Sequence, residues 1–221
     1  MISAILASRG RPDSLRRSVA SLRELADKPD AIEVVVAFDP DDEPTGAVAE
    51  DIGALTVRAP ERYGYARLYE YYRAAAEMST GDWLLNWNDD AFMTTAGWDS
   101  QIEGLPPHIM VADLHNAFSP DLCCFPAVRR EAVDALGGFC TVDNPHMDTW
   151  WQEIGRRSNT IDAIPAHVHH DRRDITGGHD DATFREGRSG WRTGEFWDRE
   201  IQGQVNAAAT VMAVLVDGRR P

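Results

Sequence analysis

The chain has 221 residues, 43% hydrophobic and 26% charged, which is the composition of a globular protein and not of a disordered one. Twenty-two Lys and Arg residues against 36 Asp and Glu residues give a net charge of −14, which disfavours DNA as a partner without excluding a local basic patch. No stretch approaches the roughly 18 apolar residues of a membrane span, and the N-terminal sequence predicts no signal peptide. The three cysteines form neither a disulfide framework nor a zinc motif, so a cytoplasmic location is expected.

The first half of the sequence alternates apolar runs with amphipathic segments. The apolar runs predict strands at 2–7, 32–38, 55–57 and 83–87. The spacing of apolar residues between these runs predicts helices from Pro12 onward, over 45–52 and over 66–78. This alternation is typical of an α/β domain with a mostly parallel sheet. Because ligands bind at the carboxyl ends of such strands, the polar turns after the first, second and fourth strands are expected at one edge.

The second half is less regular. The sequence favours strands at 109–112, 123–125 and 161–165, and helices at 130–136, 148–157 and 201–216. Residues 172–195 are rich in Gly, Asp, Arg and His and lack apolar periodicity, which predicts a long loop. There is no repeat or interdomain linker, so one domain over residues 1–221 is expected.

The clearest candidate for chemistry is the sequence Asn88-Asp89-Asp90, which directly follows the predicted strand at 83–87. Carboxylates at a strand end can hold Mg²⁺ or Mn²⁺, which prefer oxygen ligands. Such a cation can neutralise the diphosphate of a nucleotide. Asn and Asp are also ordinary turn residues, so the motif by itself leaves a structural turn as the alternative.

Four segments in order carry a resemblance to a known family: ISAILASRGRPDSLRRSVASL, EVVVAFDPDDE, GYARLYEYYRAAAEMSTGDWLLNWNDD and the later GGF. Together they resemble the GT-A glycosyltransferases, in particular the large inverting family that includes many bacterial polysaccharide synthases. The chain also resembles small predicted glycosyltransferases of actinobacterial phages. The resemblance is good over residues 1–100 and loose over 120–157. It implies one GT-A-like domain, a nucleotide-binding α/β/α sandwich, with a nucleotide-sugar half (1–100), an acceptor half (101–175) and a C-terminal loop and helix (176–221).

The resemblance also implies which residues bind a nucleotide-diphosphate sugar, with a UDP-sugar favoured. The turn after the first strand and Asp39, which stands where the family has the acid that contacts the base, belong to this set. The full set is Ala7, Ser8, Arg9, Asp39, Arg62, Gly64, Arg67, Asn88 and Asp89. Arginines suit phosphate binding, although Arg62 and Arg67 at the start of a helix are as readily explained as solvated side chains.

For the metal, the resemblance implies Mn²⁺ or Mg²⁺ on Asp89 and Asp90. Asn88 stands where the family commonly has Asp, so binding is expected to rest mainly on Asp90. In several such enzymes a histidine near the end of the core completes the site, which makes His169 and His170 candidates. In a strand these two histidines point to opposite faces. A polar strand edge with solvated histidines is the alternative.

The family's Glu-Asp pair, which contains the catalytic base, has no literal counterpart, and the nearest candidate is Asp148. A carboxylate there would deprotonate the acceptor hydroxyl, although Asp is also favoured at a helix N-terminus by capping and the helix dipole. Trp150 and Trp151 are candidates for stacking on an acceptor sugar. Because adjacent helical residues point about 100° apart, at least one of the two is expected in the core.

The expected function is therefore metal-dependent, hexosyltransferase-like transfer of a sugar from a nucleotide diphosphate to a glycan or other hydroxyl acceptor, with inversion. Two alternatives remain. One is a nucleotidyltransferase on a similar fold, for which the Ser8–Arg11 turn is a poor phosphate loop. The other is a non-catalytic module that binds nucleotide sugars or glycans, which the replacement at Asn88 favours.

Overall fold

The computed structural model describes residues 1–116, 121–143, 145–172 and 197–219, together with residues 177, 181, 182, 185 and 186. In this part of the chain the strands form one eight-stranded sheet in the order β3-β2-β1-β4-β7-β6-β8-β5. The strands are β1 (Ile2–Ser8), β2 (Ile32–Phe38), β3 (Leu55–Arg58), β4 (Trp83–Asn86), β5 (Ala91–Met93), β6 (Val111–Asn116), β7 (Pro126–Arg129) and β8 (Ile161–His170). The helices are α1 (Pro12–Glu24), α2 (Glu43–Asp51), α3 (Leu68–Met78), α4 (Trp98–Glu103), α5 (Arg130–Ala135), α6 (Met147–Ser158) and α10 (Arg199–Leu215).

The strands β3, β2, β1 and β4 run parallel to one another. Because helices cover both faces, β1 and β2 are built from nearly continuous apolar runs and are buried along most of their length. Parallel strands end at the same edge of a sheet, so the residues after β1, β2 and β4 meet there. The sequence predicted this convergence. Hydrogen bonds from Ser8 to Asp89 and from Arg9 to Asp39 confirm it.

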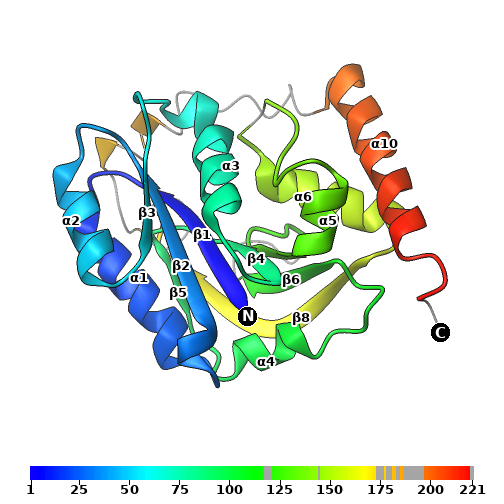
Figure 1. Ribbon diagram of the computed structural model, residues 1–221, viewed down its shortest axis with the longest axis horizontal. Coiled ribbons are helices and arrows are strands. Elements are labelled where there is room, and N and C mark those ends of the chain that lie inside the picture. Colours follow the sequence, from blue (N-terminus) through cyan, green and yellow to red (C-terminus); the bar gives the residue numbers. More distant parts are fainter. Residues whose placement is uncertain are drawn as a thin grey trace.

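The other half of the sheet is mixed. The strand β7 is antiparallel to β4 and β6, while β8 is parallel to β6 and antiparallel to β5. The pairing of β6 with β8 shifts register between Leu114 and His115. Figure 1 shows β8 as a long, curved strand that reaches from the side of α10 toward β5. The sheet is therefore mostly parallel, as predicted, with β7 and β5 reversed.

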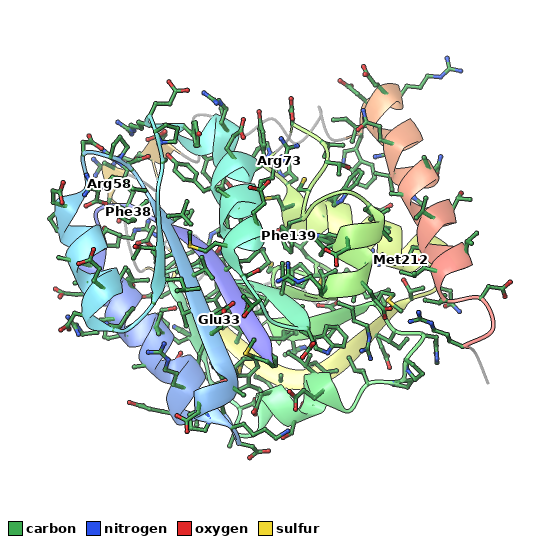
Figure 2. The ribbon with its side chains drawn as sticks, in the orientation of Figure 1. Glu33, Phe38, Arg58, Arg73, Phe139 and Met212 are labelled. Atoms are coloured by element: carbon green, nitrogen blue, oxygen red, sulfur yellow. The ribbon has the colours of Figure 1, made fainter. Side chains whose placement is uncertain are left out.

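Helices cover both faces of this sheet (Figure 1). On one face, the apolar side of α1 packs Leu15, Val19 and Leu22 into a core shared with alternate residues of β1 and β2. On the other face, a second core lies under α3, α5, α6 and α10. Figure 2 shows Phe139 near α3 and α5, and Met212 where α10 approaches α5. These two helical layers around one sheet confirm the predicted α/β/α arrangement.

Most predicted elements form close to their expected bounds, with three differences. The strand expected at 123–125 is wrong: β7 begins at Pro126, because the amide of Cys123 donates to Oε1 of Gln152 (3.0 Å) and not to a neighbouring strand. The strand expected at 161–165 continues to His170, and β5 and α4 were not predicted. The loop expected at 172–195 lies largely outside the described residues. None of the described helices is both long and apolar enough to cross a membrane.

Candidate functional site

Two adjacent carboxylates, Asp89 and Asp90, lie buried just beyond the end of β4. Oδ2 of Asp89 accepts a hydrogen bond from the hydroxyl of Ser8 (2.7 Å), at the end of β1. Nη1 of Arg11 lies 3.2 Å from Oδ1 of Asp89 and 3.0 Å from Oδ2 of Asp90, so one guanidinium bridges both carboxylates. Nε2 of His170, at the end of β8, lies 3.1 Å from Oδ1 of Asp90. Three strand ends and the start of α1 thus meet at this acidic pair.

The two carboxylates differ in their protonation. Burial, followed by the negative charge of Asp90, raises the pKa of Asp89 to about 7 against the opposing effects of Arg11 and Ser8. Burial also raises the pKa of Asp90, but its hydrogen bond with His170 and the charge of Arg11 outweigh it and hold that pKa below its ordinary value. Asp90 is therefore the anionic member of the pair, and Asp89 is the member that takes up a proton near neutral pH.

The backbone between β4 and the acidic pair is fixed by α1. The hydroxyl of Ser14 donates to the carbonyl of Asp89 (2.8 Å), and that of Ser18 donates to the carbonyl of Asn88 (3.0 Å). The indole of Trp87 in turn donates to Ser18 (2.8 Å). These bonds satisfy backbone groups that leave the sheet at this point, so the acidic pair sits on a rigid turn. The side chain of Asn88 accepts a hydrogen bond from Tyr72 (3.0 Å).

A pocket of about 90 Å³ extends from the acidic pair to the end of β2. Its lining residues are Ala7, Ser8, Arg9, Asp39, Gly64, Tyr65, Leu68, Tyr71, Asp89 and Glu186. At the far end from Asp89, the buried side chain of Asp39 accepts from Nη1 of Arg9 (2.5 Å) and from the hydroxyl of Tyr71. The predicted nucleotide-sugar residues Ala7, Ser8, Arg9, Asp39, Gly64 and Asp89 therefore line one pocket.

Two acidic side chains from late in the sequence hold arginines at this pocket. Asp181 forms a two-pronged ion pair with Arg11, with 2.5 Å to Nε and 2.8 Å to Nη2. Glu186 pairs with Nη2 of Arg62, and its other oxygen accepts from the backbone amide of Tyr65 (3.1 Å). Arginine forks and backbone amides are groups that also bind phosphate. The guanidinium groups of Arg11 and Arg62 and the amide of Tyr65 can therefore bind anions, and in this structure the carboxylates of Asp181 and Glu186 are their partners.

The predicted base, Asp148, lies half-buried in the first turn of α6 and accepts from the amide of Thr149 (2.6 Å). Burial raises its pKa, which moves the carboxylate toward the range of a general base at neutral pH. The charges of both Asp148 and Asp90 act on the pocket residue Tyr65. Burial, then the charge of Asp148, and more weakly that of Asp90 raise the pKa of Tyr65 to about 12, with Arg172 opposing them. Tyr65 therefore lies within electrostatic range of both carboxylates.

Some predicted site residues lie elsewhere. Trp150 and Trp151 are 1% and 0% exposed and belong to the core under α6, so the predicted stacking on an acceptor is wrong. His169 is exposed on the opposite face of β8 from His170, with its ring near Phe92, so it does not reach Asp90. Arg67 points out of the pocket lining and pairs with Glu61 (2.8 Å).

Sequence reasoning missed four of the residues that build the site: Arg11, Tyr65, Tyr71 and Asp181. For Arg11 a signal existed, because it stands in a turn after a buried strand and directly before the helix-starting Pro12. A side chain at that position reaches the edge where the strands end. For Asp181, which meets Arg11 across 170 residues of sequence, no local pattern carried the information.

The donor atoms at the acidic pair fit a divalent cation in part. Asp90 offers carboxylate oxygens, which are the ligands that Mn²⁺ and Mg²⁺ prefer, and His170 places an imidazole nitrogen beside them. No three His, Cys, Asp or Glu side chains of the described residues are arranged to hold a metal ion on their own. Phosphate oxygens of a bound nucleotide would add ligands to Asp90, as they commonly do at Mg²⁺ sites.

Residues 3–105 match the family model described as Glycosyl transferase family 2. Over these residues, just under half of the chain, the sequence is similar to this family, and the single α/β domain has a fold like that of the GT-A glycosyltransferases. Glycosyltransferases of this class are enzymes. A search of curated protein sequences finds no significant match.

Three solved structures illustrate the shared fold. The first is the mannosyltransferase PcManGT from Pyrobaculum calidifontis, in complex with GDP-Man and Mn²⁺: the identity is 15%, the TM-score 0.58, and 100% of this chain and 76% of that chain are covered. The second is glucosyl-3-phosphoglycerate synthase from Mycobacterium tuberculosis, in complex with Mn²⁺, UDP and glucosyl-3-phosphoglycerate. Its identity is 16% and its TM-score 0.60, and 86% of this chain and 78% of that chain are covered. The third is S. aureus TarS, with an identity of 12% and a TM-score of 0.63, where 92% of this chain and 47% of that chain are covered. At these identities the likeness shows the fold.

Proposed function

We propose that this chain is a glycosyltransferase that transfers a sugar from a nucleoside-diphosphate donor, with a UDP-sugar favoured, to a hydroxyl acceptor, with the aid of Mn²⁺ or Mg²⁺. The observation that carries the proposal is the pocket that is lined by both Asp39 and Asp89, with Asp90 joined to Asp89 through Arg11. Ser8 and Arg9 also line this pocket. The relatives in complex with GDP-Man and Mn²⁺, and with UDP and Mn²⁺, support this choice of donor and cation.

In the proposed complex, the nucleotide base binds at Asp39, and the diphosphate extends toward the acidic pair. Arg11 and Arg62 would then bind phosphate oxygens in place of Asp181 and Glu186, because a guanidinium fork pairs with phosphate as well as with carboxylate. Gly64 supports the same arrangement. A Cβ at its position would lie 2.5 Å from Oε1 of Glu186, so a larger residue would clash there. Glycine lets the carboxylate of Glu186, or a ligand group in its place, approach the backbone closely.

Asp90 and His170 would hold the cation, with Asp89 alongside. When bound, the cation acts as a Lewis acid that stabilises the negative charge of the departing diphosphate. Asp148 would accept the proton of the acceptor hydroxyl. The hydroxyl oxygen of the acceptor would then bond to the anomeric carbon of the donor sugar, as the bond from that carbon to the diphosphate breaks. One such displacement inverts the anomeric configuration. The raised pKa of Asp148 supports this role, because general bases work best when their pKa lies near the working pH.

The first experiment is a thermal-stability screen of UDP-, GDP-, CDP- and dTDP-sugars, each with and without Mn²⁺. A donor present at about 100 times its dissociation constant stabilises the native state by about 2.7 kcal/mol, which a melting curve resolves. The best donor is then assayed for Mn²⁺-dependent hydrolysis. We expect both stabilisation and hydrolysis. Asn88 stands where the family commonly has Asp, which favours one rival function, that of a non-catalytic binding module. A donor that binds but is never hydrolysed or transferred would identify such a module. No stabilisation by any donor would refute the proposal.

A further inference from the structure

The hydroxyl of Tyr71 lies at the junction of three segments around the pocket. Tyr71 is a buried residue of α3, and its hydroxyl contacts the carboxylate of Asp39 after β2. The same oxygen accepts from the backbone amides of Tyr63 (2.9 Å) and Gly64 (3.4 Å), in the loop between β3 and α3. The ring of Tyr63 packs edge-on against that of Tyr71, with 5.0 Å between the ring centroids.

These contacts fix where the hydroxyl proton is. A tyrosine hydroxyl has one hydrogen to donate and two lone pairs to accept with. The two amides occupy the accepting side, so the hydrogen points to Oδ1 of Asp39. Burial and this hydrogen bond raise the pKa of Tyr71, which keeps its proton in place. Asp39 therefore receives a hydrogen from Tyr71 on one oxygen and from Arg9 on the other (2.5 Å).

An aspartate that receives donors on both oxygens is held in one plane and stays a pure hydrogen-bond acceptor. Its remaining lone pairs can then meet only a hydrogen-bond donor, and on the edge of a nucleotide base such a donor is an N–H. Uracil N3–H and guanine N1–H offer such a group. Cytosine presents a bare ring nitrogen at the corresponding place, which an acceptor repels.

The two amide bonds give Tyr71 a second effect. The segment that they anchor carries Arg62 on one side and Tyr65 on the other, and Gly64 and Tyr65 line the pocket. Gly64 has a φ of +66°, so the chain turns sharply at this point. Without the hydroxyl, two backbone donors at this turn would lose their acceptor.

We propose that Tyr71 is a positioning residue that holds Asp39 as a fixed acceptor and the 63–65 turn against it, and thereby selects a donor whose base carries a ring N–H. This inference rests on the proposed function, because it concerns the base of the donor. It adds that the selectivity depends on a tyrosine outside the strand-end motifs.

The test compares Tyr71→Phe with Tyr69→Phe. Both variants lose one hydroxyl from a buried tyrosine of α3, but Tyr69 lies outside the pocket lining, with Arg73 over its ring. Calorimetry with Mn²⁺ measures the affinities of UDP, GDP and CDP. We expect the wild type and Tyr69→Phe to prefer UDP or GDP over CDP by about tenfold or more. In Tyr71→Phe we expect the affinity for the preferred nucleotide to fall by about tenfold, as for the loss of one hydrogen bond to a charged group, with little change for CDP.

A second measurement needs no nucleotide. In the free protein, amide hydrogen exchange at residues 63 and 64 is expected to be faster in Tyr71→Phe than in Tyr69→Phe, because the acceptor of both amides is gone. Unchanged exchange would overturn the positioning role.

The outcomes separate the inference from the function on which it rests. If the wild type prefers UDP or GDP over CDP and Tyr71→Phe keeps the same ratio, or loses affinity for all three equally, the inference is overturned and the proposed function stands. A wild type that binds nucleotides without preference also overturns the inference. A wild type that binds none of the three overturns base selection, and it overturns the proposed function as well if no donor of the stability screen binds. Hydrogen exchange alone then decides whether Tyr71 holds the turn.

Discussion

Replacing Arg11 with methionine is expected to destabilise the protein strongly, although the change keeps most of the length of the side chain. The Arg11 guanidinium is 7% exposed and bridges Asp89 and Asp90, which are 7% and 10% exposed. Its removal leaves two adjacent, largely buried carboxylates without their shared cation.

Breaking a buried ion pair by removing one partner costs about 3–5 kcal/mol. Asp89 can relieve part of this cost, because its pKa of about 7 lets it take up a proton. We therefore expect a loss at the lower end, about 3 kcal/mol at about pH 7.5. For a chain of this size about 2–4 °C of melting temperature corresponds to each kcal/mol, which gives a decrease of about 6–12 °C.

The measurement is urea denaturation, together with thermal melting, in EDTA. The matched control is Arg16→Met, which removes the same group from the same helix region. Arg16 also pairs with an aspartate, Asp51 at 2.6 Å, but the two side chains are 48% and 65% exposed. An exposed pair of this kind contributes at most about 1 kcal/mol. If Arg11→Met is no less stable than Arg16→Met, the acidic pair does not depend on Arg11 and the electrostatic account of the site fails.

Three further predictions concern the carboxylates. Asp90→Ala is expected to abolish Mn²⁺-dependent nucleotide binding while the chain stays folded, and equal affinities in calorimetry would contradict the metal assignment. Asp148→Asn should keep donor affinity within a few-fold and lower transfer by about 10²–10⁴-fold, the usual contribution of a general base, whereas a wild-type rate would move the base elsewhere. The pKa of Asp89 rises from its ordinary value of 3.8 to about 7 in the folded chain, so the folded state binds its proton more tightly and the unfolding free energy falls as pH rises from about 4 to about 7. Asp89→Asn should remove that fall in urea denaturation with EDTA, and an unchanged pH profile would show that Asp89 does not titrate there.

The parts of the fold that the sequence predicted are those fixed by local patterns. The run Ile32–Phe38 is apolar apart from Glu33, and it forms a strand with those bounds. The turns after β1, β2 and β4 could be brought to one edge because parallel strands share a direction. Cys123–Phe125 is equally apolar and is not a strand. An apolar run reports burial, and burial here comes from a loop whose amide is satisfied by a side chain, that of Gln152.

The tryptophans show a limit of the same kind. Adjacent helical residues point about 100° apart, and this separation left room for one of Trp150 and Trp151 to lie outside the core. The buried side of α6 runs through Met147, Trp150, Trp151, Ile154 and Ser158. Both indoles are buried when the apolar stripe on the helix surface is at least about 100° wide. The helix α6 packs against both the sheet and α10, and together these partners cover a stripe of that width. The direction of each side chain was predictable, but the width of the surface that covers it depends on partners far away in sequence.

The charge of the site also depends on residues that are far apart in the sequence, and it differs from the net charge of the chain. The net charge of −14 predicts repulsion of a polyanion such as a nucleoside diphosphate. At the strand ends, however, Arg9 and Arg11 in the turn after β1 and Arg62 in the loop after β3 form ion pairs with residues in or beside the pocket. Two of them are held by carboxylates, Asp181 and Glu186, that come from a segment remote from the strand-end turns. If phosphate oxygens replace these two carboxylates, the arginines exchange one anionic partner for another. A diphosphate can then enter an acidic protein while Arg11, which is 7% exposed, stays paired before and after binding.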